Sequence, residues 1–317
     1  MEKILSISVI MPVHNGESTL EKTLASLFNQ TKKFDELVIV DDASSDESVQ
    51  LIKRYLHGKQ NFTLIQNEKQ SGLAAAYNKA IKISRNDLIV TLHQDILLEN
   101  DALEKLVGTF TDEKVVASTH VVSHSMAIWN KYSFWQKCFF ARLASKDFSG
   151  IDGKFDCFRK SALEKVGLFD EKHFRTAGED GDLVFKMKKI GKIVKTDAKI
   201  IHLHKIDPNF SWKDILRKQA QYAEAQGALL RRGRIRNFFS FGKSFFREIL
   251  LIGLVVPYIW PIAVLLILTY SFYYTRLIFL TEYRDKRILL LPFLNIWLLF
   301  VSFFYSFRGF IYGKQIL

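Results

Sequence analysis

The sequence has 317 residues, a hydrophobic share of 48% and a formal net charge of +12. This length allows one large domain or two smaller ones. The two cysteines, Cys138 and Cys157, have no paired spacing, which excludes a disulfide framework and a zinc-binding cysteine motif. The first residues lead directly into a strand pattern without a secretory signal peptide, so we expect the first domain to stay in the cytosol.

Strand and helix patterns alternate in the first third of the chain. Short β-branched runs predict strands, and apolar residues three or four apart predict helices. The predicted strands cover residues 4–13, 37–40, 62–65 and 88–92. The predicted helices between them cover residues 19–29, about 46–55 and 73–83. This alternation predicts an α/β fold with a mostly parallel sheet and helices on both faces.

The pattern is less regular after residue 95. The predicted elements there are a helix over 100–110, strands over 115–122 and 155–158, a helix over 161–166, a helix from 183 to about 190, and strands over 193–195 and 200–204. Aromatic residues crowd the stretch 125–150. We interpret this stretch either as a helical insert against a membrane or acceptor, or as core packing.

The last third of the chain changes from a basic segment to an apolar one. Residues 206–244 predict a juxtamembrane linker that contains an amphipathic helix over 214–230. Between positions 207 and 248 there are nine basic and four acidic residues, a bias that is typical of contact with anionic lipid on the cytoplasmic side. No nucleic-acid-binding motif accompanies this charge, so we expect no nucleic-acid partner.

Two apolar stretches predict a membrane region over 245–317. Residues 249–275 and 288–307 contain no charged residue, and each is long enough to cross a bilayer, which takes about 20 residues. The loop between them is rich in Lys and Arg, which is unusual for a non-cytoplasmic loop. A re-entrant first stretch is therefore the alternative to two spans. In both cases the globular domain, residues 1–205, lies on the cytoplasmic side of the cell membrane.

Four motifs, in order, resemble those of family-2 inverting glycosyltransferases. They are VIMPVHNG at 9–16, VIVDDAS at 38–44, GLAAAYN at 72–78 and GEDGDL at 178–183. The resemblance extends over about two thirds of the chain. It implies a GT-A fold and a nucleotide-sugar donor, which is UDP-, GDP- or dTDP-linked, with Mg²⁺ or Mn²⁺ as the usual cofactor.

The resemblance also implies a donor site at the strand ends. It assigns recognition of the base to the second acid of the Asp41-Asp42 pair, although helix capping is an alternative role for these acids. Gly72 permits close backbone approach, and the helix that it opens favours a diphosphate, although it could also be an ordinary turn glycine. The predicted donor-binding residues are Pro12, Val13, Asn15, Asp41, Asp42, Gly72, Asn78, His93 and Gln94.

The family's Asp-x-Asp motif corresponds here to His93-Gln94-Asp95. A hard divalent cation held by carboxylates neutralises a leaving diphosphate, and we predict Asp95 as its ligand. His93 stands in place of the first acid and is predicted to contact the donor. His202 and His204 alternate along a predicted strand and should share one face. The resemblance favours His204 as a second metal ligand, whereas a structural role is the alternative.

The acidic motif at 178–183 predicts the catalytic residues. Asp180 is the expected general base, which takes the proton of the acceptor hydroxyl, and Glu179 would orient it or touch the acceptor. Helix capping is the alternative role for Asp180. We therefore predict an inverting glycosyltransferase that moves a sugar to a lipid-linked or polysaccharide acceptor at the membrane. The alternatives are a nucleotide-sugar-binding membrane scaffold with weak catalysis, and a nucleotidyltransferase.

Overall fold

The computed structural model describes residues 5–317, which form two compact units. Unit 1 consists of the described residues up to His124 together with Ser145–Glu171 and Glu179–Lys205. Unit 2 consists of Ser125–Ala144, Lys172–Gly178 and Ile206–Leu317. Unit 1 therefore ends at residue 205, as the predicted globular domain does, but two internal segments before that point belong to unit 2.

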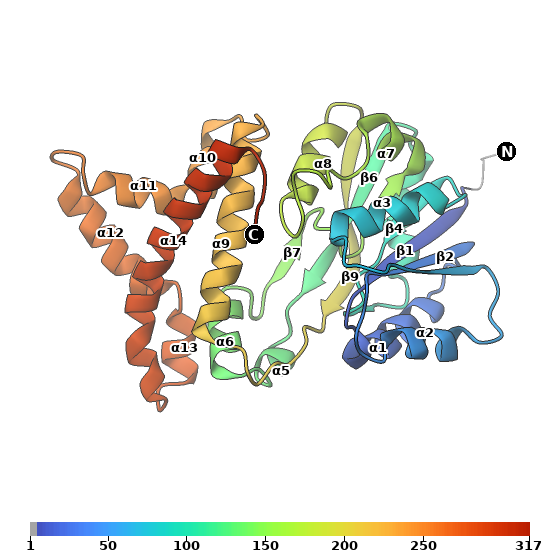
Figure 1. The fold of residues 1–317 in the computed structure, drawn as a ribbon, viewed down its shortest axis with the longest axis horizontal. Coiled ribbons are helices and arrows are strands. Elements are labelled where there is room, and N and C mark those ends of the chain that lie inside the picture. The colour runs from blue at the N-terminus through green and yellow to red at the C-terminus, as the bar shows by residue number, and fades with distance from the viewer. Residues whose placement is uncertain (1–4) are drawn as a thin grey trace. The chain divides into compact units, whose positions relative to one another are not determined.

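Unit 1 is built on one mixed β-sheet (Figure 1). Within the described residues it has nine strands, which are ordered β3-β2-β1-β4-β8-β6-β9-β5, with β7 paired to β6. Their bounds are β1 (Ile7–Val13), β2 (Glu36–Asp41), β3 (Phe62–Gln66), β4 (Leu88–Thr91), β5 (Ile96–Leu98), β6 (Val115–Ser123), β7 (Asp147–Ser149), β8 (Cys157–Arg159) and β9 (Lys192–His202).

The prediction of a mostly parallel sheet holds only for the first four strands in the order, β3, β2, β1 and β4. Strand β8 pairs antiparallel with both β4 and β6, and β9 pairs parallel with β6 and antiparallel with β5. Parallel neighbours require long crossovers, and the regular helical crossovers end with β4. Strands β5 and β7, which have three residues each, are not predicted by the sequence pattern, and β9 is one strand where the pattern predicts two.

Helices cover both faces of the sheet, as predicted (Figure 1). Helices α1 (Glu17–Phe28), α2 (Ser48–Leu56) and α4 (Ala102–Val107) share one apolar cluster with the sheet. Helices α3 (Leu73–Ile83), α7 (Lys160–Val166) and α8 (Glu179–Met187) share the cluster on the other face. Because successive side chains of a strand point to opposite faces, both clusters draw on β1, which is why its sequence is apolar on both faces except at Ser8.

Unit 2 is helical. Its helices are α5 (Met126–Trp129), α6 (Phe134–Phe140), α9 (Trp212–Arg231), α10 (Phe238–Ser244), α11 (Phe246–Gly253), α12 (Trp260–Tyr273), α13 (Arg276–Thr281) and α14 (Leu291–Tyr312). The aromatic stretch 125–150 supplies α5 and α6 to this unit. The side chains of Trp129, Tyr132 and Phe134 are buried in an apolar cluster with α9, α13 and α14. These aromatics therefore serve as core packing within a helical insert.

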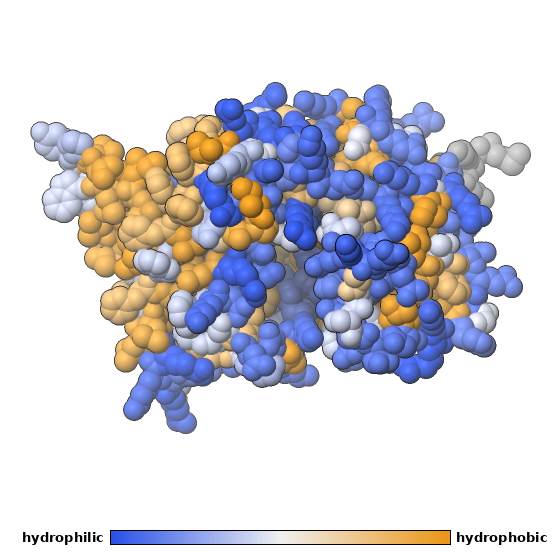
Figure 2. All heavy atoms as spheres, in the orientation of Figure 1, coloured by the Kyte–Doolittle hydropathy of each residue, from blue (hydrophilic) through white to orange (hydrophobic). Residues whose placement is uncertain are grey.

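One helix of the described chain, Lys286–Tyr312, is long and apolar enough to cross a membrane. The other predicted span, 249–275, is interrupted between α11 and α12, where Tyr258 has a positive φ of 66°. Much of the surface over α11 to α14 is hydrophobic in Figure 2. The exposed face of α14 includes large apolar side chains, namely Trp297, Phe300, Phe303, Phe304 and Phe307.

Helices α9 and α14 touch backbone to backbone at two glycines. A Cβ at Gly227 would overlap the carbonyl oxygen of Ser306, and a Cβ at Gly309 would overlap that of Glu224. Small residues are what allow two helices to approach this closely. Beside the crossing, the buried Glu224 carboxylate accepts a hydrogen bond of 2.6 Å from Arg308 Nε.

We predict that Gly309→Ala lowers the stability of unit 2, because the added methyl group would overlap the Glu224 backbone. Overpacking of this kind costs about 1–3 kcal/mol. Thermal unfolding of the detergent-solubilised chain should show a lower Tm. Gly242→Ala is the control, since a Cβ there meets no atom within 4 Å and alanine favours the helix. Equal Tm values for the two variants would contradict the close crossing.

Candidate active site

At the carboxyl end of β2, the side chains of Asp41 and Asp42 differ in their hydrogen-bond partners. The Asp42 carboxylate accepts four hydrogen bonds of 2.7–2.8 Å, from Asn67 Nδ2, from the backbone N–H and the hydroxyl of Ser71, and from the Gly72 N–H. Burial would raise the pKa of Asp42, but these hydrogen bonds outweigh it and the pKa is lowered. The buried Asp41 Oδ1 has no hydrogen-bond partner within residues 5–317. Asp42 therefore orders a loop, and Asp41 keeps the open acceptor.

Gln94 holds the turn that follows β1. Its Oε1 accepts the His14 N–H at 2.9 Å, and its Nε2 donates to the His14 carbonyl at 3.0 Å. A Cβ at Gly16 would lie 2.5 Å from Gln94 Oε1, so this contact requires glycine. Asn15 has a positive φ of 52° and its Oδ1 accepts the Ser45 N–H at 2.8 Å. Both predicted donor residues, Gln94 and Asn15, thus shape the turn with their side chains.

Four further predicted donor residues also have structural roles. Asn78 Nδ2 donates at 2.9 Å both to the Phe169 carbonyl and to Glu171 Oε2. Gly72 has a φ of 96°, a value that glycine adopts without strain. The Val13 carbonyl accepts the Asp42 N–H at 2.7 Å, and Val13 and its neighbour Pro12 are buried in β1. A role of these residues in donor binding remains a prediction.

The strand ends of β4 and β9 bring two histidines to Asp95. His202 Nε2 lies 3.1 Å from Asp95 Oδ2, and His93 Nδ1 lies 4.0 Å from Asp95 Oδ1. One ligand atom from each of the three residues lies within 4.8 Å of the others. Burial would raise the pKa of Asp95, but His202 and His93 outweigh it and the pKa is lowered, so this carboxylate is ionised. Burial lowers the pKa of His93 to about 4, which keeps its imidazole neutral.

This set of residues fits a divalent cation. One carboxylate and two imidazoles suit Mn²⁺ better than Mg²⁺, which prefers oxygen ligands. Buried nitrogens of both histidines, His93 Nε2 and His202 Nδ1, have no hydrogen-bond partner among residues 5–317. The atoms nearest to Asp95 are the other ring nitrogens, His93 Nδ1 and His202 Nε2, and an imidazole nitrogen binds metal in its neutral form.

His204 lies next to this group rather than in it. Strand β9 ends at His202, and His204 follows with a positive φ of 41°. Its ring centroid is 3.6 Å from that of His202 and 6.0 Å from that of His124, on which it stacks. Burial lowers the pKa of His204 to about 2, and the charge of His202 lowers it further. The histidine of this segment that reaches Asp95 is therefore His202, which the sequence analysis did not choose.

A buried charge network lies under the turn at residues 152–154. The Asp156 carboxylate is completely buried, accepts the N–H groups of Asp152 and Gly153 at 3.1 and 2.8 Å, and lies 3.1 Å from His120 Nδ1. Burial would lower the pKa of His120, but Asp156 and Asp152 outweigh it and the pKa is raised. Lys154 Nζ pairs with Asp152 at 2.5 Å. Because Lys154 already neutralises Asp152, we interpret this cluster as an ion-pair network that fixes the turn rather than as a metal site.

Asp180 stands in the first turn of α8, next to this turn. A Cβ at Gly153 would lie 3.7 Å from each of three atoms, Asp180 Oδ1, His93 Nε2 and Tyr77 Cε2. Gly153 has a φ of 78°, and its carbonyl accepts the Tyr77 hydroxyl at 2.7 Å. The missing side chain at residue 153 thus leaves space beside both Asp180 and the His93 imidazole.

The surroundings of Asp180 suit a general base. Burial raises its pKa, and the neighbouring charges of Glu179 and Asp152 raise it further, whereas Lys154 opposes them. Burial also raises the pKa of Glu179. A carboxylate with a raised pKa takes up a proton more readily than an exposed one. Asp152, Gly153, Lys154 and Asp156 are absent from the residues predicted above, because their one signal in the sequence is the Asp-Gly turn at 152–153.

Two family models match the chain. The model described as glycosyl transferase family 2 matches residues 8–167, and the one described as glycosyl transferase family group 2 matches residues 88–307. The chain spans less than half the length of the first curated relatives that it matches.

Two curated relatives and one solved structure illustrate the likeness. Chondroitin synthase of Pasteurella multocida is 24% identical over 75% of this chain and 24% of its own length. Poly-beta-1,6-N-acetyl-D-glucosamine synthase of Staphylococcus aureus is 25% identical over 54% of this chain and 43% of its own length. A mannosyltransferase from Pyrobaculum calidifontis, solved with GDP-Man and Mn²⁺, matches with a TM-score of 0.60 at 18% identity, over 95% of this chain and 87% of the other. The last match shows a shared GT-A-like fold.

We predict that Asp156→Asn destabilises unit 1, because an amide would turn its NH₂ group toward a donor and remove one negative charge from beside the buried His120 and the partly buried Lys154. Removing one partner of a buried, hydrogen-bonded ion network costs about 2–4 kcal/mol. Urea unfolding followed by circular dichroism would measure this loss. Asp112→Asn is the control, because Asp112 makes a solvent-exposed pair with Lys192 and its loss should change little. A midpoint for Asp156→Asn equal to that of the control would refute the structural role.

Proposed function

The chain belongs to glycosyl transferase family 2, and we propose that it transfers a sugar from a nucleotide-sugar donor to an acceptor by an inverting mechanism. The observation that carries the proposal is the position of Asp180, whose carboxylate and the His93 imidazole both border the space at Gly153. A half-buried carboxylate of raised pKa thus stands beside the residues that would hold the activated donor.

The nucleotide is proposed to bind at the carboxyl ends of β1 and β2. Asp41 Oδ1 would accept hydrogen bonds from the base or ribose, because it is the acceptor of the pair without a partner in residues 5–317. Asp42 would act through the loop that it orders, which ends at Gly72 and the start of α3. Open α/β sheets bind ligands at this edge. A UDP-, GDP- or dTDP-linked sugar fits the proposal, and the similar mannosyltransferase was solved with GDP-Man.

The donor diphosphate is proposed to be held with a divalent cation. His93, Asp95 and His202 would bind Mn²⁺, the cation present in the structure of the similar mannosyltransferase. Such a cation neutralises charge that develops on the leaving diphosphate. The ionised Asp95 and the neutral His93 supply the protonation states that ligands require.

In the proposed transfer Asp180 acts on the acceptor. Its carboxylate takes the proton of the acceptor hydroxyl while the hydroxyl oxygen forms a bond to the anomeric carbon of the sugar. The bond from that carbon to the diphosphate breaks on the opposite side, so the nucleotide diphosphate leaves and the configuration inverts. Glu179, buried next to Asp180, would keep the carboxylate oriented and raise its basicity.

The acceptor is proposed to be a lipid-linked sugar or a polysaccharide at the cytoplasmic face of the membrane. The exposed apolar side chains of α12 and α14 support attachment to a bilayer. The interrupted pair α11 and α12 favours the re-entrant alternative for this stretch over a second span. Relatives that include a poly-beta-1,6-N-acetyl-D-glucosamine synthase support a polysaccharide product.

We predict that Asp180→Asn binds the donor normally but transfers sugar at least about a hundredfold more slowly, because general-base catalysis contributes factors of this order. Release of nucleotide diphosphate with matched acceptor would measure transfer, and isothermal titration with the donor would measure binding. Asp197→Asn, on an exposed carboxylate of β9, is the control. In the native chain kcat/KM should rise with pH as Asp180 loses its proton, and above the raised pKa it should level off. Normal turnover by Asp180→Asn would exclude it as the base.

A pair of histidine variants tests the cation site. We expect His202→Ala to weaken Mn²⁺ binding by about tenfold or more, because His202 reaches Asp95. The His204→Ala variant should weaken Mn²⁺ binding much less, because His204 packs on the His202 ring. Electron paramagnetic resonance of free Mn²⁺ measures binding without relying on activity. The opposite order of the two variants would restore His204 as the ligand. Binding that neither variant affects would place the cation elsewhere.

A further inference from the structure

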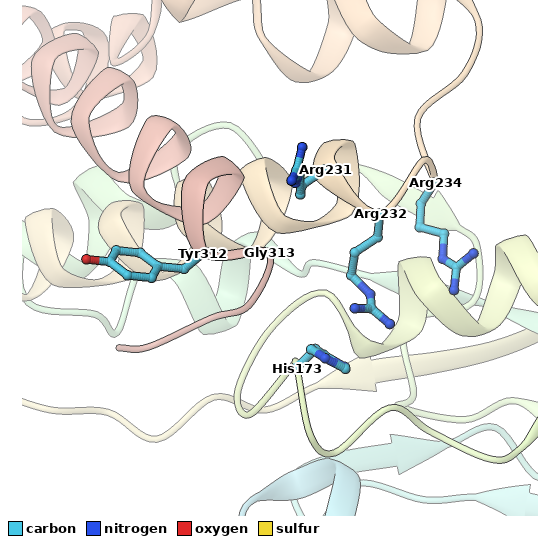
Figure 3. A pocket seen from close by; sticks show the side chains of 6 residues that line it. All are labelled: His173, Arg231, Arg232, Arg234, Tyr312 and Gly313. Atoms are coloured by element: carbon cyan, nitrogen blue, oxygen red, sulfur yellow. The ribbon is translucent and has the colours of Figure 1, made fainter.

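An open pocket of about 460 Å³ in unit 2 is lined by basic side chains (Figure 3). Its lining residues are His173, Arg231, Arg232, Arg234, Tyr312 and Gly313. Three of the six are arginines, and none is a carboxylate. A concave surface with this composition attracts anions, and guanidinium groups match the oxygens of phosphate in two-pronged hydrogen bonds.

The pocket forms where two helices end. Helix α9 ends at Arg231, and Gly233 (φ 67°) turns the chain so that the Arg234 N–H donates to the Leu229 carbonyl at 2.9 Å. Helix α14 ends one residue before Gly313, which has a φ of 62°. Helix carboxyl ends carry partial negative charge and favour nearby cations. The partial negative charge of these helix ends therefore stabilises the arginines even without a ligand.

Two arginines and the histidine face the same side. In Figure 3 the side chains of Arg232 and Arg234 point to the side where His173 lies, whereas Arg231 projects away from them. His173 is held in place through its carbonyl, which accepts the Gln315 N–H at 2.8 Å. Two separate segments of the chain, 232–234 and the one that contains His173, thus supply one wall of the pocket.

The segment after the pocket indicates which kind of phosphate-bearing molecule would bind there. Helix α10 starts four residues beyond Arg234 and has no buried residue. Its first two side chains, Phe238 and Phe239, are 92% and 80% exposed. Arginines followed by exposed aromatic side chains are typical of segments that lie in the membrane interface, with cations at the headgroups and rings among the acyl chains. A soluble phosphate would not require these phenylalanines.

We propose that this pocket binds the phosphate of an acidic membrane lipid, with the acyl chains running toward the α10 phenylalanines. The inference rests on the membrane attachment proposed above. Its assay involves no sugar and no catalysis, so its failure is distinguishable from failure of the transferase proposal.

Native mass spectrometry of the full chain in detergent tests the site, with phosphatidylglycerol and zwitterionic phosphatidylcholine as competing probes. The native chain should retain phosphatidylglycerol in preference to phosphatidylcholine. Arg232→Gln/Arg234→Gln should weaken phosphatidylglycerol binding by at least about tenfold and abolish the preference. Arg236→Gln/Lys243→Gln removes the same charge from the same segment outside the pocket lining and should leave the preference unchanged.

Three outcomes would overturn the proposal. One is an equal loss in both double variants, which would indicate diffuse charge attraction. Another is full retention by Arg232→Gln/Arg234→Gln. The last is displacement of phosphatidylglycerol by inorganic phosphate at equal concentration, which would identify a site for free phosphate. Circular dichroism of each variant reports folding, and the single variant Arg234→Gln, in the coil after α9, should still show a weaker preference if the double variant fails to fold.

Discussion

The buried carboxylate of Asp156 joins the parts of unit 1 on which the candidate active site stands. Its side chain holds the N–H groups of Asp152 and Gly153, and its backbone carbonyl accepts the N–H of Thr91 at the end of β4 at 2.8 Å. Two residues after Thr91 and two residues before Asp156, the His93 N–H donates to the Lys154 carbonyl at 2.9 Å. Because a buried charge without these partners would be strongly destabilising, the turn at 152–154 and the end of β4 are constrained to meet. Their meeting sets the position of His93 relative to Gly153.

The charges around this junction help to explain why the pKa of Asp180 is raised. Asp152 pairs with Lys154, and Asp156 lies beside His120, whose pKa the two carboxylates raise, so each of these carboxylates has a basic partner without Asp180. Asp180 therefore adds a further negative charge beside these paired groups. Burial raises its pKa, and the neighbouring charge of Glu179 raises it further. Asp95 has the opposite environment, because two imidazoles face it and its pKa is lowered. One carboxylate is thus prepared to accept a proton and the other to stay ionised beside a cation.

The sequence predicted those parts of the site that depend on local pattern. Residues at the ends of β2 and β4 became candidates because a buried strand followed by acids is a strong signal, and Asp180 because its motif is contiguous. Their roles in binding and catalysis stay predictions. The prediction of His204 as a metal ligand stays untested, but the residue beside Asp95 is His202, a difference that the sequence does not show because alternation cannot tell where β9 ends. The role of Asp42 in ordering its loop depends on Asn67 and Ser71, which no periodicity connects to it. The network around Asp156 combines residues of irregular segments, 36 positions apart in the case of His120, and such contacts have no signal in a single sequence.

Sequence alone also gives an incomplete picture of the apolar end of the chain, because the two faces of α14 have different environments. One face of α14 is small or polar and packs inward: Asn295 Nδ2 donates to the Ser271 carbonyl at 2.6 Å, Ser302 bonds Glu248 at 2.8 Å, and Gly309 touches α9. The other face carries the exposed aromatic side chains. A helix surrounded by lipid needs apolar residues on every side, whereas a helix packed on charged α9 needs them on one side only. The number of apolar residues in α14 therefore reflects its exposed face. Its other face allows this long apolar helix to pack against the amphipathic α9, and Arg308 of α14 pairs with the buried Glu224 of α9.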